Sequence, residues 1–331
     1  MKNLITLILG ISLVCSCNSN DLNNDEELLV KNELINQSVE KNNISIYLNN
    51  WMSNITDSKN ITQISIPGTH DSGALHDPVI GPSYTAKTQN LTIKEQLNIG
   101  IRFLDIRCKV SDNGFAIYHG PINQNLKFEN VVKSIKEFLQ NNPSEFILLS
   151  IKKEDLKKDN NNQFAKVFEE YLTGELGSIV YKDNKIFPSI KEVRGKVIII
   201  KRFSNTSKVG YNANSGWVDN YKGDFTIYNN LSSFTIQDYY NVDNLSNKWE
   251  IVENQFLNAS SSYSTSAMYL NFTSGIKKNI LYIPNIKTVS DYINPKVKDY
   301  FNSSTKKNNG VCIMDFANAN YTFPIINSNF K

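Results

Sequence analysis

The sequence predicts an α/β fold, a single, irregular (β/α)8 TIM-type barrel. From Trp51 onward, short runs rich in β-branched and aromatic residues alternate with segments of helical periodicity, which is typical of parallel strands covered by helices. Polar residues also follow the predicted strands where these end, as they do at the functional face of such barrels. Since no long linker, internal repeat or glycine-rich phosphate loop interrupts residues 46–331, we expect one domain there.

The elements of the barrel follow from residue type and spacing. Predicted strands cover residues 64–66, 102–110, 145–152, 196–202, 234–238, 268–272 and 310–315. Apolar residues at helical spacing predict helices over 131–139, 164–172 and 245–256. For a further helix we expect Asn294 as the N-cap and Pro295 as the first helical residue.

The N-terminal segment indicates export. Lys2 precedes an apolar run over residues 4–14, which is too short for a transmembrane helix of about 20 residues. Val14 and Ser16 before Cys17 resemble a bacterial lipobox, so we expect a signal peptide over 1–16 and an acylated Cys17; plain leader cleavage is the alternative. The polar residues of 17–45 predict a flexible tether. The protein should be exported and lipid-anchored to the bacterial cell envelope or surface, or otherwise secreted.

Charge and composition exclude several classes of protein. The formal net charge is +3, from 35 Lys+Arg and 32 Asp+Glu, too little for a nucleic-acid partner. Only three histidines are present, so a metal site built from many imidazoles is excluded. Cys108 and Cys312 are expected to be free thiols, because the predicted strands place them on non-neighbouring strands, facing outward.

Two histidines have similar surroundings in the sequence. His70 follows a predicted strand, His119 follows an apolar run, and each comes before a turn. His70 and Asp71 are adjacent in an extended segment, so each should serve a different partner. Two histidines, each oriented by its own carboxylate, can act as a base and an acid for displacement at phosphorus, and His70 and His119 are the candidates. Arg107 offers a bidentate fork for the phosphate oxygens without a metal, and Asp105 on the same side of the strand should orient it. His76 is expected to be solvated surface.

These segments resemble one known family. In order along the chain they read ISIPGTHDSGA at 64–74, GIRFLDIR at 100–107, YHGP at 118–121, NPSEFILLSIKKE at 142–154, RGKVIIIKRF at 194–203, TIQDYY at 235–240 and LNFTS at 270–274. Together they are similar to the bacterial phosphatidylinositol-specific phospholipase C family over roughly residues 50–320. The resemblance implies a catalytic barrel over residues 46–331.

The resemblance implies a role for each catalytic candidate. His70 looks like the general base that takes the proton of the inositol 2-hydroxyl, and Asp315 like the carboxylate that holds its imidazole. His119 looks like the general acid that protonates the diacylglycerol oxygen, with Asp71 as its partner. Arg107 occupies the phosphate-stabilising position. Calcium-dependent relatives have a metal-binding carboxylate there, so the arginine implies catalysis without a metal or other cofactor.

The resemblance also implies how the sugar is held. Lys152, Arg202 and Asp238 match positions that hydrogen-bond the inositol hydroxyls, and Tyr240 matches the aromatic residue on which the ring packs. The implied reaction gives diacylglycerol and inositol 1,2-cyclic phosphate, with slower hydrolysis to inositol 1-phosphate. A lyase acting mainly on glycosylphosphatidylinositol anchors shares these residues and stays open, as does an inactive inositol-lipid-binding surface protein. A metal-dependent glycerophosphodiesterase would need a carboxylate cluster that the sequence lacks beside the histidines.

The expected partner is phosphatidylinositol or glycosylphosphatidylinositol in a membrane surface, contacted by a monomer. Two apolar loops, 79–84 and 280–284, are candidates for the membrane-facing rim, with Tyr84, Tyr282 and Ile283 as anchors in the absence of tryptophan. Simple loop packing is the alternative.

Overall fold

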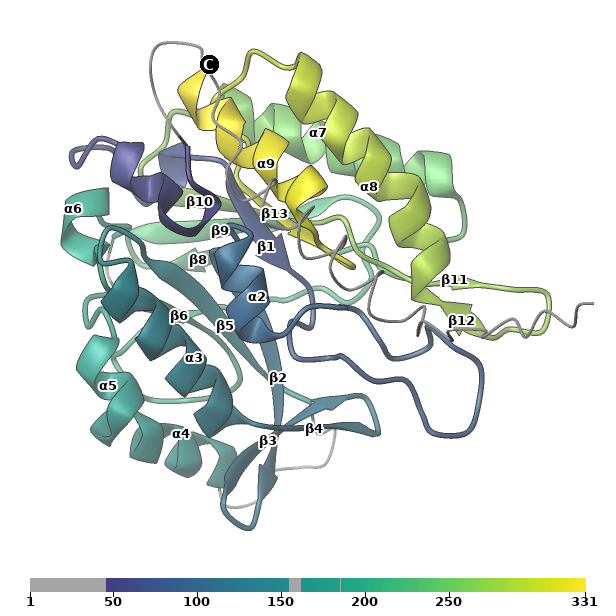
Figure 1. The fold of residues 1–331 in the computed structure, drawn as a ribbon, viewed down its shortest axis with the longest axis horizontal. Coiled ribbons are helices and arrows are strands. Elements are labelled where there is room, and N and C mark those ends of the chain that lie inside the picture. The colour runs from purple at the N-terminus through teal and green to yellow at the C-terminus, as the bar shows by residue number, and fades with distance from the viewer. Residues whose placement is uncertain (1–45, 155–161, 185) are drawn as a thin grey trace, which may run out of the picture.

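A computed structural model describes residues 46–154, 162–184 and 186–331, and shows a nearly closed barrel with helices outside it (Figure 1). The predicted signal peptide, Cys17 and the tether 17–45 lie outside the described residues. Around the barrel the strands are β7 (Tyr211–Asn212), β6 (Val197–Arg202), β5 (Ile147–Lys153), β2 (Phe103–Ser111), β1 (Ile66–Thr69), β13 (Val311–Met314), β10 (Ala267–Phe272), β9 (Ser232–Gln237) and β8 (Asp224–Asn229).

Most of the barrel is parallel, as the alternation predicts. Neighbouring strands from β7 round to β9 pair in parallel, and β8 joins β9 in the antiparallel sense. Between β7 and β8 the side chain of Asn229 spans the gap: its Oδ1 accepts from the Asn212 amide at 3.2 Å and its Nδ2 donates to the Asn212 carbonyl at 2.7 Å. At this point the described structure links the two end strands of the sheet through a side chain instead of a backbone ladder, and the barrel is irregular there.

Most helices pack against the outer surface of the sheet, whereas the buried residues of the short helix α6 (Ile190–Val193) join the core inside the barrel. The other helices are α2 (Ile93–Asn98), α3 (Phe128–Asn141), α4 (Gln163–Thr173), α5 (Glu175–Ile179), α7 (Leu245–Ser261), α8 (Ile286–Ser303) and α9 (Ala319–Asn327). Alternate strand residues separate two cores: Phe103, Leu148 and Phe234 fill the barrel, whereas Cys108 and Cys312 lie in the outer layer. The two cysteines are free and β1 lies between their strands, which confirms the prediction.

A short 3-10 helix, η1 (Leu48–Asn54), begins the described chain at the end of the sheet opposite the hairpin of β11 (Lys277–Lys278) and β12 (Pro284–Asn285) (Figure 1). Trp51 of η1 is buried with the core that fills the barrel. Arg102 is fully buried, donates to the carbonyls of Leu48 and Asn49, and pairs with Glu145 at 2.8 Å. These bonds fix the N-terminal segment to the barrel. Two further 3-10 helices are η2 (Ile61–Gln63) and η3 (Ser328–Phe330).

Two predictions about element boundaries were wrong. The helix expected from Asn294 begins at Ile286, where the side chain of Asn285 accepts from the Thr288 amide, and Pro295 lies inside it. The first strand is β1, at 66–69 and not at 64–66, because Pro67 and Gly68 are part of the strand. A Cβ at Gly68 would lie 2.8 Å from Cβ of Phe103, so glycine permits the close pairing of β1 with β2.

An antiparallel extension of β2 was not predicted. β3 (Gly114–His119) pairs with β2, and β4 (Ile122–Lys127) pairs with β3. His119 therefore lies at the end of a hairpin strand rather than on a strand of the barrel.

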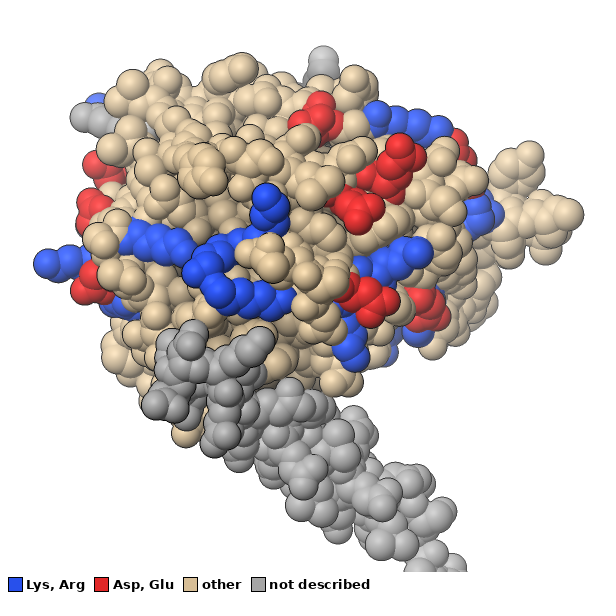
Figure 2. Space-filling model, turned by 90° about the horizontal axis from the view of Figure 1, so that it is seen from above, with Lys and Arg blue, Asp and Glu red and all other residues tan. Residues whose placement is uncertain are grey.

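The surface charge is mixed. On the face shown in Figure 2 most atoms belong to uncharged residues, and Lys and Arg form a band with Asp and Glu near both its ends. Within the described ranges, no helix is both long and apolar enough to cross a membrane.

Candidate active site

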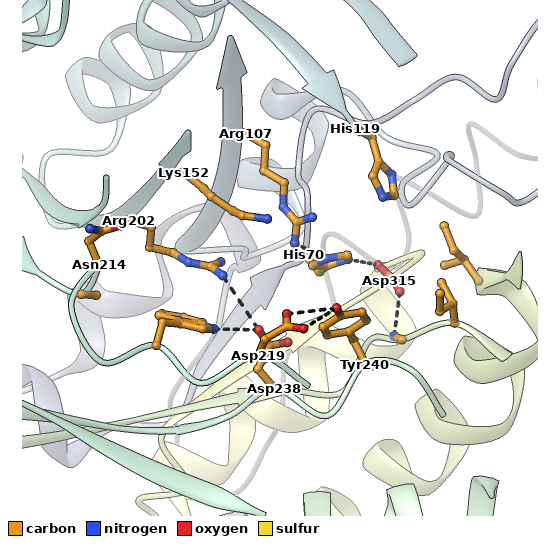
Figure 3. A pocket seen from close by; sticks show the side chains of 15 residues that line it. His70, Arg107, His119, Lys152, Arg202, Asn214, Asp219, Asp238, Tyr240 and Asp315 are labelled. Atoms are coloured by element: carbon orange, nitrogen blue, oxygen red, sulfur yellow. Dashed lines mark hydrogen bonds and ion pairs between the residues drawn. The ribbon is translucent and has the colours of Figure 1, made fainter. Parts of the chain in front are cut away.

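A pocket of about 440 Å³ opens at the C-terminal ends of the barrel strands (Figure 3). It brings together all the site residues predicted within the barrel except Asp71, which is buried behind it. The predicted residues that line the pocket are His70, Arg107, His119, Lys152, Arg202, Asp238, Tyr240 and Asp315.

Strand register sets the three cations of the pocket side by side. Arg107 on β2 pairs in register with Lys152 on β5, and Lys152 pairs with Arg202 on β6. Asp105, two residues before Arg107 on β2, accepts from Arg107 Nε at 3.2 Å and from Arg202 Nη1 at 3.2 Å. Because residues two apart share a strand face, the sequence could predict that Asp105 lies beside Arg107, and the structure confirms it.

His70 follows β1 and is held from both sides of its ring. Nδ1 lies 2.8 Å from Oδ1 of Asp315, and Nε2 lies 2.6 Å from Nη2 of Arg107. A guanidinium only donates, so Nε2 accepts and the ring proton is on Nδ1, directed at Asp315. In this tautomer Nε2 carries no proton, as a general base requires, and its lone pair accepts from Arg107.

Buried amide side chains fix this pair. Gln89 Nε2 donates to the carbonyls of His70 and Met314, both at 3.0 Å, and so joins the end of β1 to that of β13. Asn294 of α8 donates to the carbonyl of Asp315 at 2.8 Å. Asn294, predicted as a helix cap, is thus a buried bond donor beneath the site.

Asp71 occupies an unusual position next to His70. Its φ is +38°, a left-handed value that a non-glycine residue adopts rarely, and such strain is common at functional sites. The turn directs the carboxylate away from His70, as the sequence predicts, into a fully buried place where neither oxygen has a hydrogen-bond partner. Burial raises the pKa of Asp71 well above its usual range, although Arg107 opposes the shift.

His119 faces His70 across the pocket, with ring centroids 6.4 Å apart and planes perpendicular. Its Nδ1 donates to the carbonyl of Ala86 at 2.6 Å and lies 3.6 Å from Oδ2 of Asp71. A carbonyl therefore holds the ring, with the predicted carboxylate close behind. Burial, followed by the charges of Arg107 and His70, lowers the pKa of His119 to about 4.

Arg107 is surrounded by carboxylates. Besides Asp105, its nitrogens lie 3.7 Å from Asp71 and 3.9 Å from Glu154. Although burial opposes its charge, these neighbours raise the pKa of Arg107. In the part of the chain that the structure describes, no cluster of His, Cys, Asp or Glu is arranged to hold a metal ion. Arg107 is a permanent cation at 2.6 Å from His70, and His119 faces His70, so a phosphate placed between the two histidines would lie beside the guanidinium.

The other half of the pocket is aromatic and polar. The Arg202 guanidinium lies 3.6 Å from the Trp217 ring centroid, and Trp217 Nε1 donates to Asp238 at 3.0 Å. The hydroxyl of Tyr240 donates to Asp219 at 3.0 Å. Such fixed donors and acceptors around aromatic faces suit a polyhydroxylated ring.

The sequence did not identify Glu154, Trp217 and Asp219 as site residues. Glu154 ends the motif at 142–154 and accepts from the Gly120 amide at 2.8 Å, which ties the His119 turn to β5. Its position in that motif was the available signal. Trp217 and Asp219 lie between β7 and β8, where no periodicity directs a side chain inward.

Comparisons with known proteins identify relatives of the whole barrel. The family model described as phosphatidylinositol-specific phospholipase C, X domain, matches residues 64–203. The 1-phosphatidylinositol phosphodiesterase of Staphylococcus aureus (strain Newman) is 32% identical over 83% of this chain and 89% of its own length. That of Listeria monocytogenes is 28% identical over 86% of both chains.

Solved structures agree with these relatives. A variant of the phosphatidylinositol-specific phospholipase C from Staphylococcus aureus superposes with a TM-score of 0.77 at 29% identity, over 85% of this chain and 96% of that one. The Listeria monocytogenes enzyme gives 0.71 at 26% identity, over 85% and 98%. A further Staphylococcus aureus structure concerns modulation of membrane binding.

Proposed function

Because this chain belongs to the phosphatidylinositol-specific phospholipase C family, we propose that it cleaves phosphatidylinositol to diacylglycerol and inositol 1,2-cyclic phosphate. The observation that carries the proposal is the chain of contacts from Asp315 through His70 to Arg107, with His119 on the opposite side of the pocket. It provides a base, an acid and a phosphate-binding cation around one cavity.

In the first step His70 Nε2 takes the proton of the inositol 2-hydroxyl, whose oxygen attacks phosphorus. The bond from phosphorus to the glycerol oxygen breaks, and His119 gives that oxygen a proton. Attack within one molecule benefits from proximity and needs no external nucleophile. Asp315 stabilises the imidazolium that forms on His70, because its carboxylate already accepts from Nδ1 at 2.8 Å. In the slower second step the histidines exchange roles and water opens the cyclic phosphate.

Substrate charge prepares the acid. In the free enzyme burial and the positive charge of Arg107 lower the pKa of His119 to about 4. A phosphodiester anion beside Arg107 neutralises that charge and raises the pKa of His119, so that the ring gains its second proton. Asp71 lies 3.6 Å from Nδ1 and has no hydrogen bond, so the positive charge gained by His119 favours the ionised carboxylate of Asp71, which then acts as the counter-charge.

The inositol ring is bound by the other half of the pocket. Lys152 and Arg202 donate to its hydroxyls, Asp238 accepts from them, and Tyr240 packs on the ring. Because Arg202 is stacked on Trp217 and bonded to Asp105, its remaining donors are directed before the sugar arrives.

The lipid is reached at a membrane surface through two loops at the mouth of the pocket. Exposed apolar side chains gather on residues 79–80 and on the β11–β12 hairpin at Ile280, Leu281 and Tyr282. The two loops are joined by a bond from the Ile286 amide to the Tyr84 carbonyl at 2.9 Å. Tyr84 itself is half-buried against Phe316, so the tips, not Tyr84, supply the apolar contact.

We place the barrel outside the cell as a monomer, tethered by residues 17–45 to a lipid-modified Cys17. Radiolabelled palmitate should enter the wild-type protein in its producing cell and not a Cys17→Ser variant. Equal labelling of the two would contradict the anchor.

The test of activity is the identity of the phosphorus product. Pure protein is incubated with phosphatidylinositol, and separately with phosphatidylcholine, in EDTA, and phosphorus NMR follows the reaction. A cyclic phosphate signal from the inositol lipid alone supports the proposal; no product until calcium is added would contradict the metal-free mechanism. His70→Ala and His119→Ala should each abolish diacylglycerol release, and a variant near the wild-type rate would remove that residue from its role.

A further inference from the structure

A lysine that catalysis does not use is buried beneath the sugar half of the pocket. Lys248 lies in the first turn of α7 and is fully buried. Its Nζ donates to the carbonyls of Phe272 at 2.6 Å and Tyr239 at 2.7 Å, and to Oε1 of Gln237 at 3.2 Å. An ammonium has three N–H donors, so these uncharged oxygens use all of them.

Two of the three oxygens that bind Lys248, those of Gln237 and Tyr239, belong to the segment that carries the sugar-binding residues Asp238 and Tyr240, and the third, the carbonyl of Phe272, ends the neighbouring strand β10. Gln237 ends β9, and the chain from Gln237 to Tyr240 alternates: Gln237 and Tyr239 are buried, whereas Asp238 and Tyr240 line the pocket. Gln237 Nε2 also donates to the Phe272 carbonyl of β10 at 2.9 Å. Lys248 therefore binds the buried side of segment 237–240, and the opposite side of this segment lines the pocket.

We propose that Lys248 is a positioning residue for inositol recognition: its ammonium clamps the ends of β9 and β10 so that Asp238 and Tyr240 face the sugar. This assignment rests on the proposed function, since it concerns the sugar subsite of the same pocket. The catalytic groups come from β1, β2, β3 and β13, to which none of the three oxygens belongs.

The contacts of Lys248 indicate which backbone segment would lose a hydrogen bond if this lysine were replaced. The Phe272 carbonyl keeps a second donor, Gln237 Nε2, whereas Lys248 is the donor that the Tyr239 carbonyl has in the described structure. The segment 238–240 therefore loosens while β10 keeps its bond. Burial lowers the pKa of Lys248 to about 7 and so disfavours the ammonium, whereas the attraction of Asp238 and Asp315 opposes this shift. The three accepting oxygens around Nζ favour the charged form, which alone has a donor for each of them.

The test is the separation of KM from kcat in Lys248→Met, measured with a soluble short-chain phosphatidylinositol so that membrane docking does not enter. The matched control is Lys201→Met. Lys201 is also a buried lysine, but its Nζ donates to the Ser207 carbonyl and it does not line the pocket. Loss of ground-state sugar contacts should raise KM about tenfold in Lys248→Met with kcat within about threefold, and leave Lys201→Met at wild-type values of both.

Each alternative result has a distinct meaning. An unchanged KM in a folded Lys248→Met, or an equal rise in Lys201→Met, overturns the positioning role. Lys248→Gln, which is neutral but keeps two donors, should show a smaller rise and carries the test if Lys248→Met does not fold; failure of both to fold makes Lys248 a stability residue and also overturns the role. A wild-type protein that releases no inositol phosphate contradicts the proposed function instead.

Discussion

Replacement of Asp315 by Asn tests how the base is prepared, because it removes a charge while keeping the shape. Oδ1 of Asp315 accepts from His70 Nδ1 at 2.8 Å, and Oδ2 accepts weakly from the Gly275 amide at 3.4 Å. An asparagine cannot satisfy both donors. If its oxygen faces His70, its NH₂ group faces the Gly275 N–H, and two donors meet. If its NH₂ group faces His70, the ring proton must move to Nε2, where it meets the donors of the Arg107 guanidinium.

The size of the effect follows from these contacts. A charge-assisted hydrogen bond contributes about 1.5–3 kcal/mol and a neutral one about 0.5–1.5 kcal/mol, so their exchange costs about 1–1.5 kcal/mol as His70 becomes protonated. The unmatched buried donor costs about 1–3 kcal/mol more, although part is already present before the reaction. Together they predict that kcat falls about 10- to 10³-fold in Asp315→Asn.

The assay is the initial rate with soluble short-chain phosphatidylinositol, beside a thermal melt that verifies folding. Asp291→Asn is the matched control, because Asp291 lies exposed on α8 and pairs with Lys287 instead of the pocket. Nitrogen NMR of the His70 ring should show the proton on Nδ1 in the wild type and a mixture of tautomers in the variant. A folded Asp315→Asn with kcat within about threefold of wild type would contradict the role of this carboxylate.

Further predictions concern the general acid His119, the apolar tip of the β11–β12 hairpin and the buried ion pair between Arg102 and Glu145. Arg107→Gln should lower kcat about 10²- to 10³-fold. Burial is the largest cause of the lowered pKa of His119 and the charge of Arg107 is the next, so removal of that charge raises the pKa. The limb of the kcat/KM profile that reports deprotonation of the acid should then move to higher pH. A limb that does not move would contradict the coupling between the two residues. Ile280→Ser with Leu281→Ser should weaken sedimentation with lipid vesicles about tenfold or more and spare turnover of soluble substrate, whereas equal loss of both would indicate misfolding. Glu145→Gln leaves the buried charge of Arg102 unpaired, so urea unfolding should show a loss of about 3–5 kcal/mol; an unchanged midpoint would contradict it.

Much of the barrel could be predicted because its strands are strongly patterned. In residues 103–107, alternation alone places Asp105 and Arg107 on the face of Phe103, inside the barrel. The start of α8 was mispredicted because Asn294-Pro295 is also a good cap sequence. The helix tolerates Pro295 in its interior, and Asn294 is used to bind the Asp315 carbonyl, a tertiary contact that local spacing does not reveal.

The site was harder to predict where the chain lacks periodicity. Trp217 and Asp219 reach the pocket from the irregular segment between β7 and β8, and only their spatial neighbours Arg202 and Tyr240 reveal them. Similarly, the Ala86 carbonyl that holds His119 comes from a loop 33 residues away in sequence. Backbone groups of this kind carry no side-chain signature, so the sequence indicates only the carboxylate Asp71.

The most direct measurement uses phosphatidylinositol whose 2-hydroxyl is methylated. If His70 activates that hydroxyl for attack on the phosphorus, the methyl ether should occupy the pocket as an inhibitor and release no diacylglycerol, while the unmodified lipid gives the cyclic phosphate. Release of diacylglycerol and of an acyclic inositol 1-phosphate from the ether at a rate near that of the natural lipid would show that water is the nucleophile and contradict the mechanism.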